Sequence, residues 1–295
     1  MQRLHFSFMA YRGNRWFWVA LTLALGTIVA YARDDAGEPP SGGTPLGWTL
    51  GILGGLIILW LLAYGLRRRS YHAQWTTAQG WLSAHVYLGL ALVVIATLHT
   101  GFQFGWNVHT LAYALVILVV ASGCWGVWAY LQLPRQITEA RGGLTRADMA
   151  QQILELDRRA LTLARAVSMD VHRWISSAIE GARTTGGAWA QLRAKDLSTM
   201  VVERNGVAVS VPNVDQDTLT ELLADLTSRA SDAKLASQLQ DLLALVSAKV
   251  TLMQRMRRDL RLQGLVEVWL LFHVPLSLAL LAALAAHVFA VLYFW

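Results

Sequence analysis

Four histidines in this chain lie inside strongly apolar stretches, where an ionisable side chain is costly to place and usually has a function. They form two pairs, His85/His99 and His273/His287, and the members of each pair are fourteen positions apart. A neutral imidazole ligates metal ions through one of its ring nitrogens. The same spacing on two separate segments therefore indicates two metal sites with two histidines each.

Each pair lies in an apolar run long enough to cross a bilayer, residues 81–102 and 269–293. An α-helix turns about 100° and rises about 1.5 Å per residue, so fourteen residues make about four turns less 40° and climb roughly 21 Å. Both histidines of a pair then share one helix face, one toward each leaflet of a hydrocarbon core about 30 Å thick. Two such helices can present two facing histidine pairs, one above the other, which is the geometry of two bis-histidine haems.

A single histidine in an apolar helix is more often a hydrogen-bonded packing residue than a ligand. A proton relay is a further use of intramembrane histidines. The repeated spacing favours ligation over both alternatives.

Composition sets the class of protein. The chain has 295 residues, and 55% of them are hydrophobic. It contains 13 tryptophans and has a mean hydropathy of +0.40. These values predict a membrane protein with room for one soluble module. The lone Cys124 excludes an intrachain disulfide, a cysteine-held iron–sulfur cluster and a CxxCH-attached haem. Any haem is therefore non-covalent and held by histidine.

The elements that must position the histidines follow from the apolar runs. We predict an all-α membrane protein with five transmembrane helices in a haem-binding bundle, at about 16–31, 46–66, 80–101, 110–133 and 266–294. The first run ends in Ala30-Tyr31-Ala32, which resembles a signal-peptide cleavage site, but we expect a retained helix. Pro275 is expected to kink the last span locally.

Small residues recur in two of the spans. Gly47, Gly51 and Gly55 are spaced by four, which favours close helix packing and leaves a porphyrin contact open. In the fourth span Ser122, Gly123 and Gly126 fit against a flat cofactor or another helix.

The polar insertion at 134–264 is predicted to be mostly helical, with one long amphipathic helix over 145–181 broken by Gly186-Gly187. Thr145 and Asp148 resemble a capping box. Residues 199–212 alternate around Asn205-Gly206 and predict a small β-hairpin. Ser231 is expected to cap a last helix that continues to Arg261. The insertion holds no phosphate-binding or dinucleotide-binding motif, and its 18 basic and 15 acidic residues indicate a solvated docking module rather than a nucleic-acid surface.

The positive-inside rule orients the spans. Six arginines flank the spans on one side of the membrane, three in the N-terminal arm and three in Arg67–Arg69. On the other side only Arg33 flanks them. This predicts an inner (plasma) membrane protein with a cytoplasmic N-terminus and insertion and an outer, periplasmic C-terminus. The two histidine helices then run in parallel, which pairs His85 with His273 and His99 with His287.

Parallel helices with two histidines fourteen apart resemble the di-haem core of the transmembrane b-type cytochromes, above all the cytochrome b of quinol–cytochrome c reductases. The resemblance covers spans three to five. It implies haem iron ligated by the four histidines, with Gly89 and Gly101 as small residues against porphyrin. The chain lacks a PEWY-type quinol motif, so the quinone chemistry of that family does not carry over.

For several other polar residues the sequence allows two interpretations. Arg67 and Arg68, with Arg69 and His72, can pair with haem propionates, although a stop-transfer cluster explains them as well. Trp106, Asn107 and His109 suit either the outer propionates or an interfacial anchor. Glu267 and Asp259 are candidate proton carriers for a quinone, whereas His5 and His172 look like surface residues.

The sequence thus predicts a di-haem membrane cytochrome that binds two haem b groups and carries electrons between redox partner proteins, the quinone pool or both. It would be a non-catalytic subunit of an oxidoreductase, surrounded by membrane lipid. A quinone site and a homodimer stay open, and we expect no nucleic-acid partner. The alternatives are a metal-ion transporter, which would call for intramembrane carboxylates that the spans nearly lack, and a haem-independent scaffold or sensor.

Overall fold

The structure is a computed structural model, and it describes residues 8–34, 41–69, 77–182, 196–204 and 206–294. The described part is mainly α-helical, with one two-stranded antiparallel sheet, and it divides into two compact units. Unit 1 comprises residues 1–129 and 269–295, and unit 2 comprises residues 130–268. The predicted insertion, 134–264, falls within unit 2.

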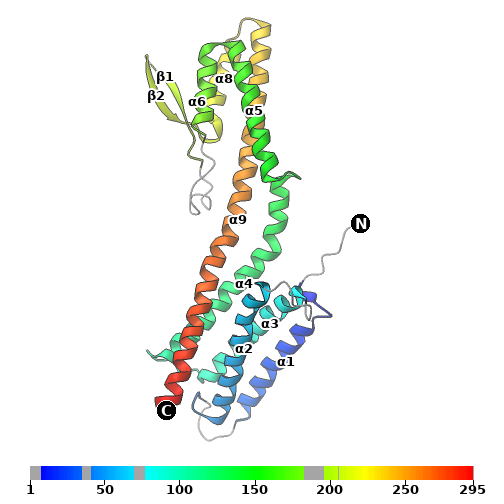
Figure 1. Cartoon of the computed structure of the whole chain (residues 1–295), viewed down its shortest axis with the longest axis vertical. Coiled ribbons are helices and arrows are strands. Elements are labelled where there is room, and N and C mark those ends of the chain that lie inside the picture. Colours follow the sequence, from blue (N-terminus) through cyan, green and yellow to red (C-terminus); the bar gives the residue numbers. More distant parts are fainter. Residues whose placement is uncertain (1–7, 35–40, 70–76, 183–195, 205, 295) are drawn as a thin grey trace. The chain divides into compact units, whose positions relative to one another are not determined.

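Five helices are long and apolar enough to cross a membrane, as a multi-pass membrane protein requires. They are α1 (Arg15–Ala32), α2 (Pro45–Arg69), α3 (Ala78–Thr100), and the apolar parts of α4 (Val108–Arg141) and α9 (Ala233–Phe294). Figure 1 shows them in the blue, cyan, green and red parts of the chain. Each predicted span coincides with one of these helices.

The core of unit 1 contains buried side chains from four of these helices, α2, α3, α4 and α9. α3 packs directly against both α1 and α2. Leu92, Ile95 and Leu98 from α3 meet Leu50, Ile57 and Ile58 from α2, Val116 from α4 and Leu280 from α9. Large apolar side chains also remain exposed on the outer faces, such as Ile52, Leu59 and Leu271. A helix that is apolar on all sides suits a lipid surround.

The N-terminal ends of two helices have clear local causes. Thr77 caps α3 by accepting a hydrogen bond from the Gly80 N–H. Asn107 accepts a hydrogen bond from the Thr110 N–H at the start of α4. Because such caps satisfy backbone groups that a helix start leaves open, they fix where each helix begins.

Unit 2 holds α5 (Arg146–Val167), α6 (Met169–Glu180), β1 (Thr199–Arg204), β2 (Val207–Pro212) and α8 (Asp217–Arg229), and also the first part of α9. Its core includes Ala164, Ile175, Met200, Leu223 and Leu242, so α5, α6, β1, α8 and α9 all contribute. Short 3-10 turns lie at Phe8–Ala10 in unit 1 and Val214–Gln216 in unit 2.

The predicted hairpin is present, with Arg204 paired to Val207 across the turn. Gly206 has a φ of 76°, a left-handed conformation that favours glycine. β1 packs beside α6 (Figure 1). The Thr145–Asp148 capping box is confirmed, since each residue bonds the other's backbone N–H.

Two helix predictions in the insertion were wrong. The helix expected over 145–181 breaks at Ser168, whose extended backbone ends α5 and whose side chain caps α6 by accepting from the Val171 N–H. The last helix is present and continues past Arg261 into the fifth span as predicted, but Ser231 does not cap it. That helix, α9, starts at Ala233, where Asp232 accepts from the Lys234 N–H, and it continues through Pro275 to Phe294. Gly186 and Gly187 lie outside the described residues.

Candidate functional site: four histidines in the membrane unit

The histidine His99, near the end of α3, is held by the backbone of α2. Its Nδ1 lies 2.8 Å from the carbonyl oxygen of Gly47. A carbonyl oxygen only accepts hydrogen bonds, so Nδ1 carries the proton and donates it. In the neutral ring Nε2 is then an unprotonated lone-pair donor, which is the state that ligates a metal.

The histidine His273, in α9, is held in the same way by α4. Its Nδ1 lies 2.7 Å from the Ser122 Oγ, and that hydroxyl donates its own proton to the carbonyl of Val119. When the hydroxyl gives its one proton to Val119, its oxygen accepts a hydrogen bond from the Nδ1–H of His273. In that arrangement the Nε2 of His273 is also free of a proton.

The histidines His99 and His287 lie close together. The ring centroids of His99 and His287 are 5.9 Å apart, and their planes cross at 82°. Metal–imidazole bonds are about 2 Å long, so two imidazoles on opposite sides of one metal have centroids roughly 6 Å apart. The observed separation is close to that distance.

A third histidine near His99 and His287 is His109, in the first turn of α4. Its Nδ1 lies 2.5 Å from the Nδ1 of His287, with ring centroids 4.6 Å apart. From the sequence we predicted for His109 only a role with propionates or as an interfacial anchor. No local pattern shows this contact, because it joins residues 178 positions apart. Trp106, in the preceding turn, is fully exposed.

The histidines His85 and His273 each lie beside aromatic rings. The ring of Tyr64 lies 5.2 Å from that of His85, and the ring of Trp269 lies 5.4 Å from that of His273. The carbonyl of Leu61 is close to the His85 ring, but the buried Nδ1 of His85 has no partner at hydrogen-bond distance among the described residues.

Glycines create the space around these rings. A Cβ at Gly51 would lie 2.7 Å from the Cε1 of His99, so the ring occupies the place of a side chain. A Cβ at Gly126 would lie 2.1 Å from the Trp269 ring, whose Nε1 donates to the Ser122 carbonyl at 2.8 Å. Gly47 makes room for the Ser41 carbonyl, and a Cβ at Gly55 would meet nothing within 4 Å. The three glycines spaced by four therefore differ: Gly47 and Gly51 make room for different contacts, and Gly55 faces open space.

The two predicted porphyrin glycines differ. Gly89, one turn after His85, is buried, yet a Cβ there would meet no atom within 4 Å. Gly101 ends α3 with a φ of 57°, and this left-handed helix end is a sufficient reason for glycine. The side chains of Arg67 and Arg68, and all of His5 and His72, lie outside the described residues.

The proton-carrier hypothesis does not suit Asp259. Its carboxylate is fully buried, accepts from Arg141 Nε at 2.7 Å and also pairs with Arg146. Both carboxylate oxygens are taken by arginines, and the carboxylate ties α9 to α4 and α5 within unit 2. His172, as predicted, lies at the surface of unit 2, where it accepts from Arg165.

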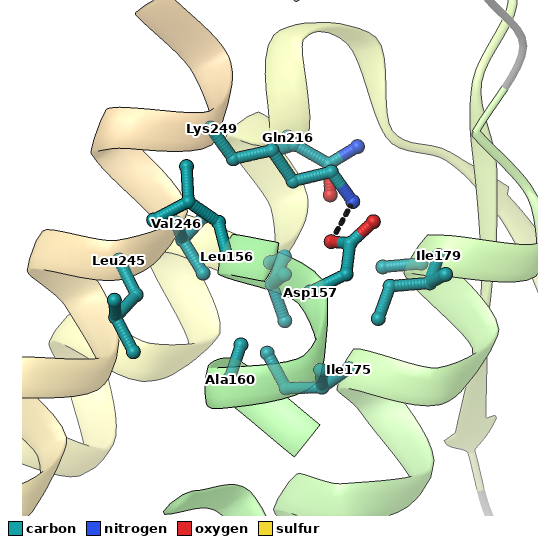
Figure 2. Close-up of a pocket in the computed structure, with 11 residues that line it drawn as sticks. Leu156, Asp157, Ala160, Ile175, Ile179, Gln216, Leu245, Val246 and Lys249 are labelled. Atoms are coloured by element: carbon teal, nitrogen blue, oxygen red, sulfur yellow. Dashed lines mark ion pairs between the residues drawn. The ribbon is translucent and has the colours of Figure 1, made fainter. Parts of the chain in front are cut away.

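A small cavity in unit 2 lies beside a buried ion pair, Lys249 with Asp157 at 2.6 Å. Figure 2 shows this pair above Ala160 and Ile175. The cavity measures about 10 Å³, which is room for about one water molecule. Within the residues described, no group of three or more histidine, cysteine or acidic side chains is arranged to hold a metal ion.

Comparison of this chain with protein-family models, with curated proteins and with solved structures finds no match.

Proposed function

We propose that this chain is a membrane cytochrome that holds two b haems, one between His85 and His273 and one between His99 and His287, and that it carries electrons across the bilayer. The observation that carries the proposal is the hydrogen bonding of the His99 and His273 rings. Each donates through Nδ1 to a fixed acceptor, which leaves Nε2 available as a ligand. Ligating histidines in metalloproteins almost always have such an acceptor on the other ring nitrogen.

The residues around the histidines support the fit of a flat macrocycle. The open space at buried Gly89 lies on the same helix face as His85. At His85 the buried nitrogen without a hydrogen-bond partner among the described residues is Nδ1, so there Nδ1 rather than Nε2 is the nitrogen available to a ligand. Gly123 places its backbone close to His273, since a Cβ there would lie 3.6 Å from the ring.

When bound, haem supplies one-electron redox chemistry at its iron. The four histidines would hold the haems, with the rings of His99 and His273 oriented through Gly47 and Ser122 and with apolar side chains in the core around them. Two histidines for each haem would leave no coordination site for a substrate, which favours electron transfer over catalysis. The protein would therefore act as the electron-transfer subunit of an oxidoreductase.

The rise of about 21 Å between paired histidines puts the two sites near opposite faces of the membrane. By the positive-inside rule the N-terminus and unit 2 are cytoplasmic in an inner membrane. Redox proteins at either face, or quinone in the membrane, would then be the donor and acceptor.

Reconstitution in sealed vesicles tests this function. The chain is inserted into liposomes that contain ferricyanide, a reductant that cannot cross the membrane is added outside, and loss of ferricyanide is followed. We expect electron transfer that depends on the protein and falls at least tenfold in His99→Ala and in His273→Ala. Transfer that is equal in vesicles without protein would overturn the proposal, as would transfer unchanged by both substitutions. His172→Ala is the matched control and should transfer electrons like the wild type.

A further inference from the structure

The partner of His287 is a third histidine, His109, at the start of α4. The two Nδ1 atoms lie 2.5 Å apart, and both rings are half-buried. Neutral imidazole carries one proton, so a hydrogen bond between two Nδ1 atoms requires one ring to donate and the other to accept. Geometry alone leaves both directions open.

The proposed function decides the direction. If His287 ligates through Nε2, that nitrogen has no proton, and the neutral ring must carry its proton on Nδ1. His287 then donates to His109, and His109 must keep Nδ1 unprotonated and carry its own proton on Nε2. The same logic holds for His99, whose partner, the Gly47 carbonyl, can only accept, and for His273 when the Ser122 hydroxyl gives its proton to Val119.

Local hydrogen bonds hold the turn that carries His109. Asn107 accepts a hydrogen bond from the Thr110 N–H at 2.9 Å, and the Thr110 hydroxyl accepts from the Gly105 N–H at 3.0 Å. These bonds fix the first turn of α4 on both sides of His109. A side chain on a fixed turn can orient its partner because little conformational freedom is lost.

We propose that His109 is a positioning residue for the outer haem site, and that it accepts a hydrogen bond from His287 and thereby fixes the tautomer and ring orientation of that ligand. This inference rests on the proposed function. It assigns His109 no contact with the iron or with the propionates. An accepted hydrogen bond makes the donor imidazole a more basic ligand, which stabilises ferric over ferrous iron.

The test uses the full chain loaded with haem in detergent, with a redox titration and low-temperature electron paramagnetic resonance of each low-spin haem. The outer signal is the one that His99→Ala removes. We expect His109→Ala to raise the midpoint potential of the outer haem and shift its resonance. His109→Asn places a carbonyl acceptor near the former Nδ1 and should return both values toward the wild type. Ser122→Ala, the matched change at the inner pair, should move the inner haem and spare the outer one.

The outcomes separate this inference from the proposed function. Wild-type protein without haem would overturn the proposed function and this inference together. Two haems whose potentials and resonances are both unchanged in His109→Ala would overturn the inference alone. Loss of the outer haem in His109→Ala but not in His109→Asn supports positioning. Loss in both variants would instead make His109 a ligand and would also overturn the inference.

Discussion

The imidazole of His99 donates from Nδ1 to the carbonyl oxygen of Gly47 across 2.8 Å, and the two residues lie 52 positions apart on α3 and α2. The contact is close because Gly51, one turn further along α2, has no side chain to fill the space that the ring occupies. One helix thus sets both the tautomer and the place of a candidate ligand on another.

Gly51→Ala tests that relationship. The added methyl would lie 2.7 Å from His99 Cε1, so the ring must move and its bond to Gly47 must lengthen or break. We expect partial loss of the outer haem and a loss of stability of about 1–3 kcal/mol. Gly55→Ala is the matched control, because a Cβ there meets nothing within 4 Å, and it should retain both haems. Equal haem content in the two variants would contradict this account of Gly51.

The pairing of histidines between helices is tested by single substitutions. His99→Ala and His287→Ala should each remove the same haem signal and leave the other, whereas His85→Ala and His273→Ala should remove the second signal. Reduced-minus-oxidised spectra and haem quantification per chain measure this. A shared loss in His85→Ala and His287→Ala would show antiparallel pairing and contradict the proposed arrangement.

The buried carboxylate of Asp259 is expected to matter for the stability of unit 2. Asp259→Ala leaves Arg141 and Arg146 without their partner, and both arginine side chains are about one-third exposed. Water therefore relieves part of the cost, and we expect a loss of about 2–3 kcal/mol, below the range for fully buried pairs. Hydrogen exchange in α4, α5 and α9 of the whole chain measures it. Glu139→Ala, which breaks an exposed pair with Arg135, should cost much less because water screens exposed pairs; equal costs would contradict the assignment.

The carboxyl of Asp196 predicts a pH dependence in unit 2. Burial alone would raise its pKa, but hydrogen bonds from Ser198 and the Asp215 N–H, with the charge of Arg257, outweigh burial and hold the pKa below its ordinary value. A carboxyl with a lowered folded-state pKa stabilises the fold above its unfolded pKa of about 3.9. That contribution is lost as the pH falls through the folded-state pKa.

Asp196→Asn should therefore be less stable than the wild type at pH 6, and the difference should shrink as the pH is lowered from about 4 to 2.5. Hydrogen exchange of β1 and β2 in the whole chain, measured across this range, reports it. A difference that stays constant with pH would show that Asp196 acts only through packing.

Local patterns in the sequence were sufficient for the spans, the capping box and the hairpin. Long apolar runs identify membrane-length helices whatever their neighbours are, and Asn205-Gly206 sets a two-residue turn by backbone preference alone. The break at Ser168 also had a local signal, because a serine followed by Asp170 suits a helix start. The apolar periodicity on both sides concealed it.

The contacts around the histidines were not predictable in this way. Ser122 and Gly126 were identified as small residues, but their partners His273 and Trp269 lie on another helix more than 140 positions later. The sequence predicted that His109 lies near the outer site, but it did not predict the contact with His287. Such contacts depend on the rotation of each helix about its axis, which the pattern of apolar residues leaves open when a helix is apolar on all sides.

The central claim is that the four histidines hold two haems, and a dithionite-reduced minus oxidised spectrum of the purified chain tests it most directly when haem and protein are quantified in the same sample. The account predicts two six-coordinate, low-spin b haems per chain. A colourless protein, prepared with haem supplied during expression, would contradict it.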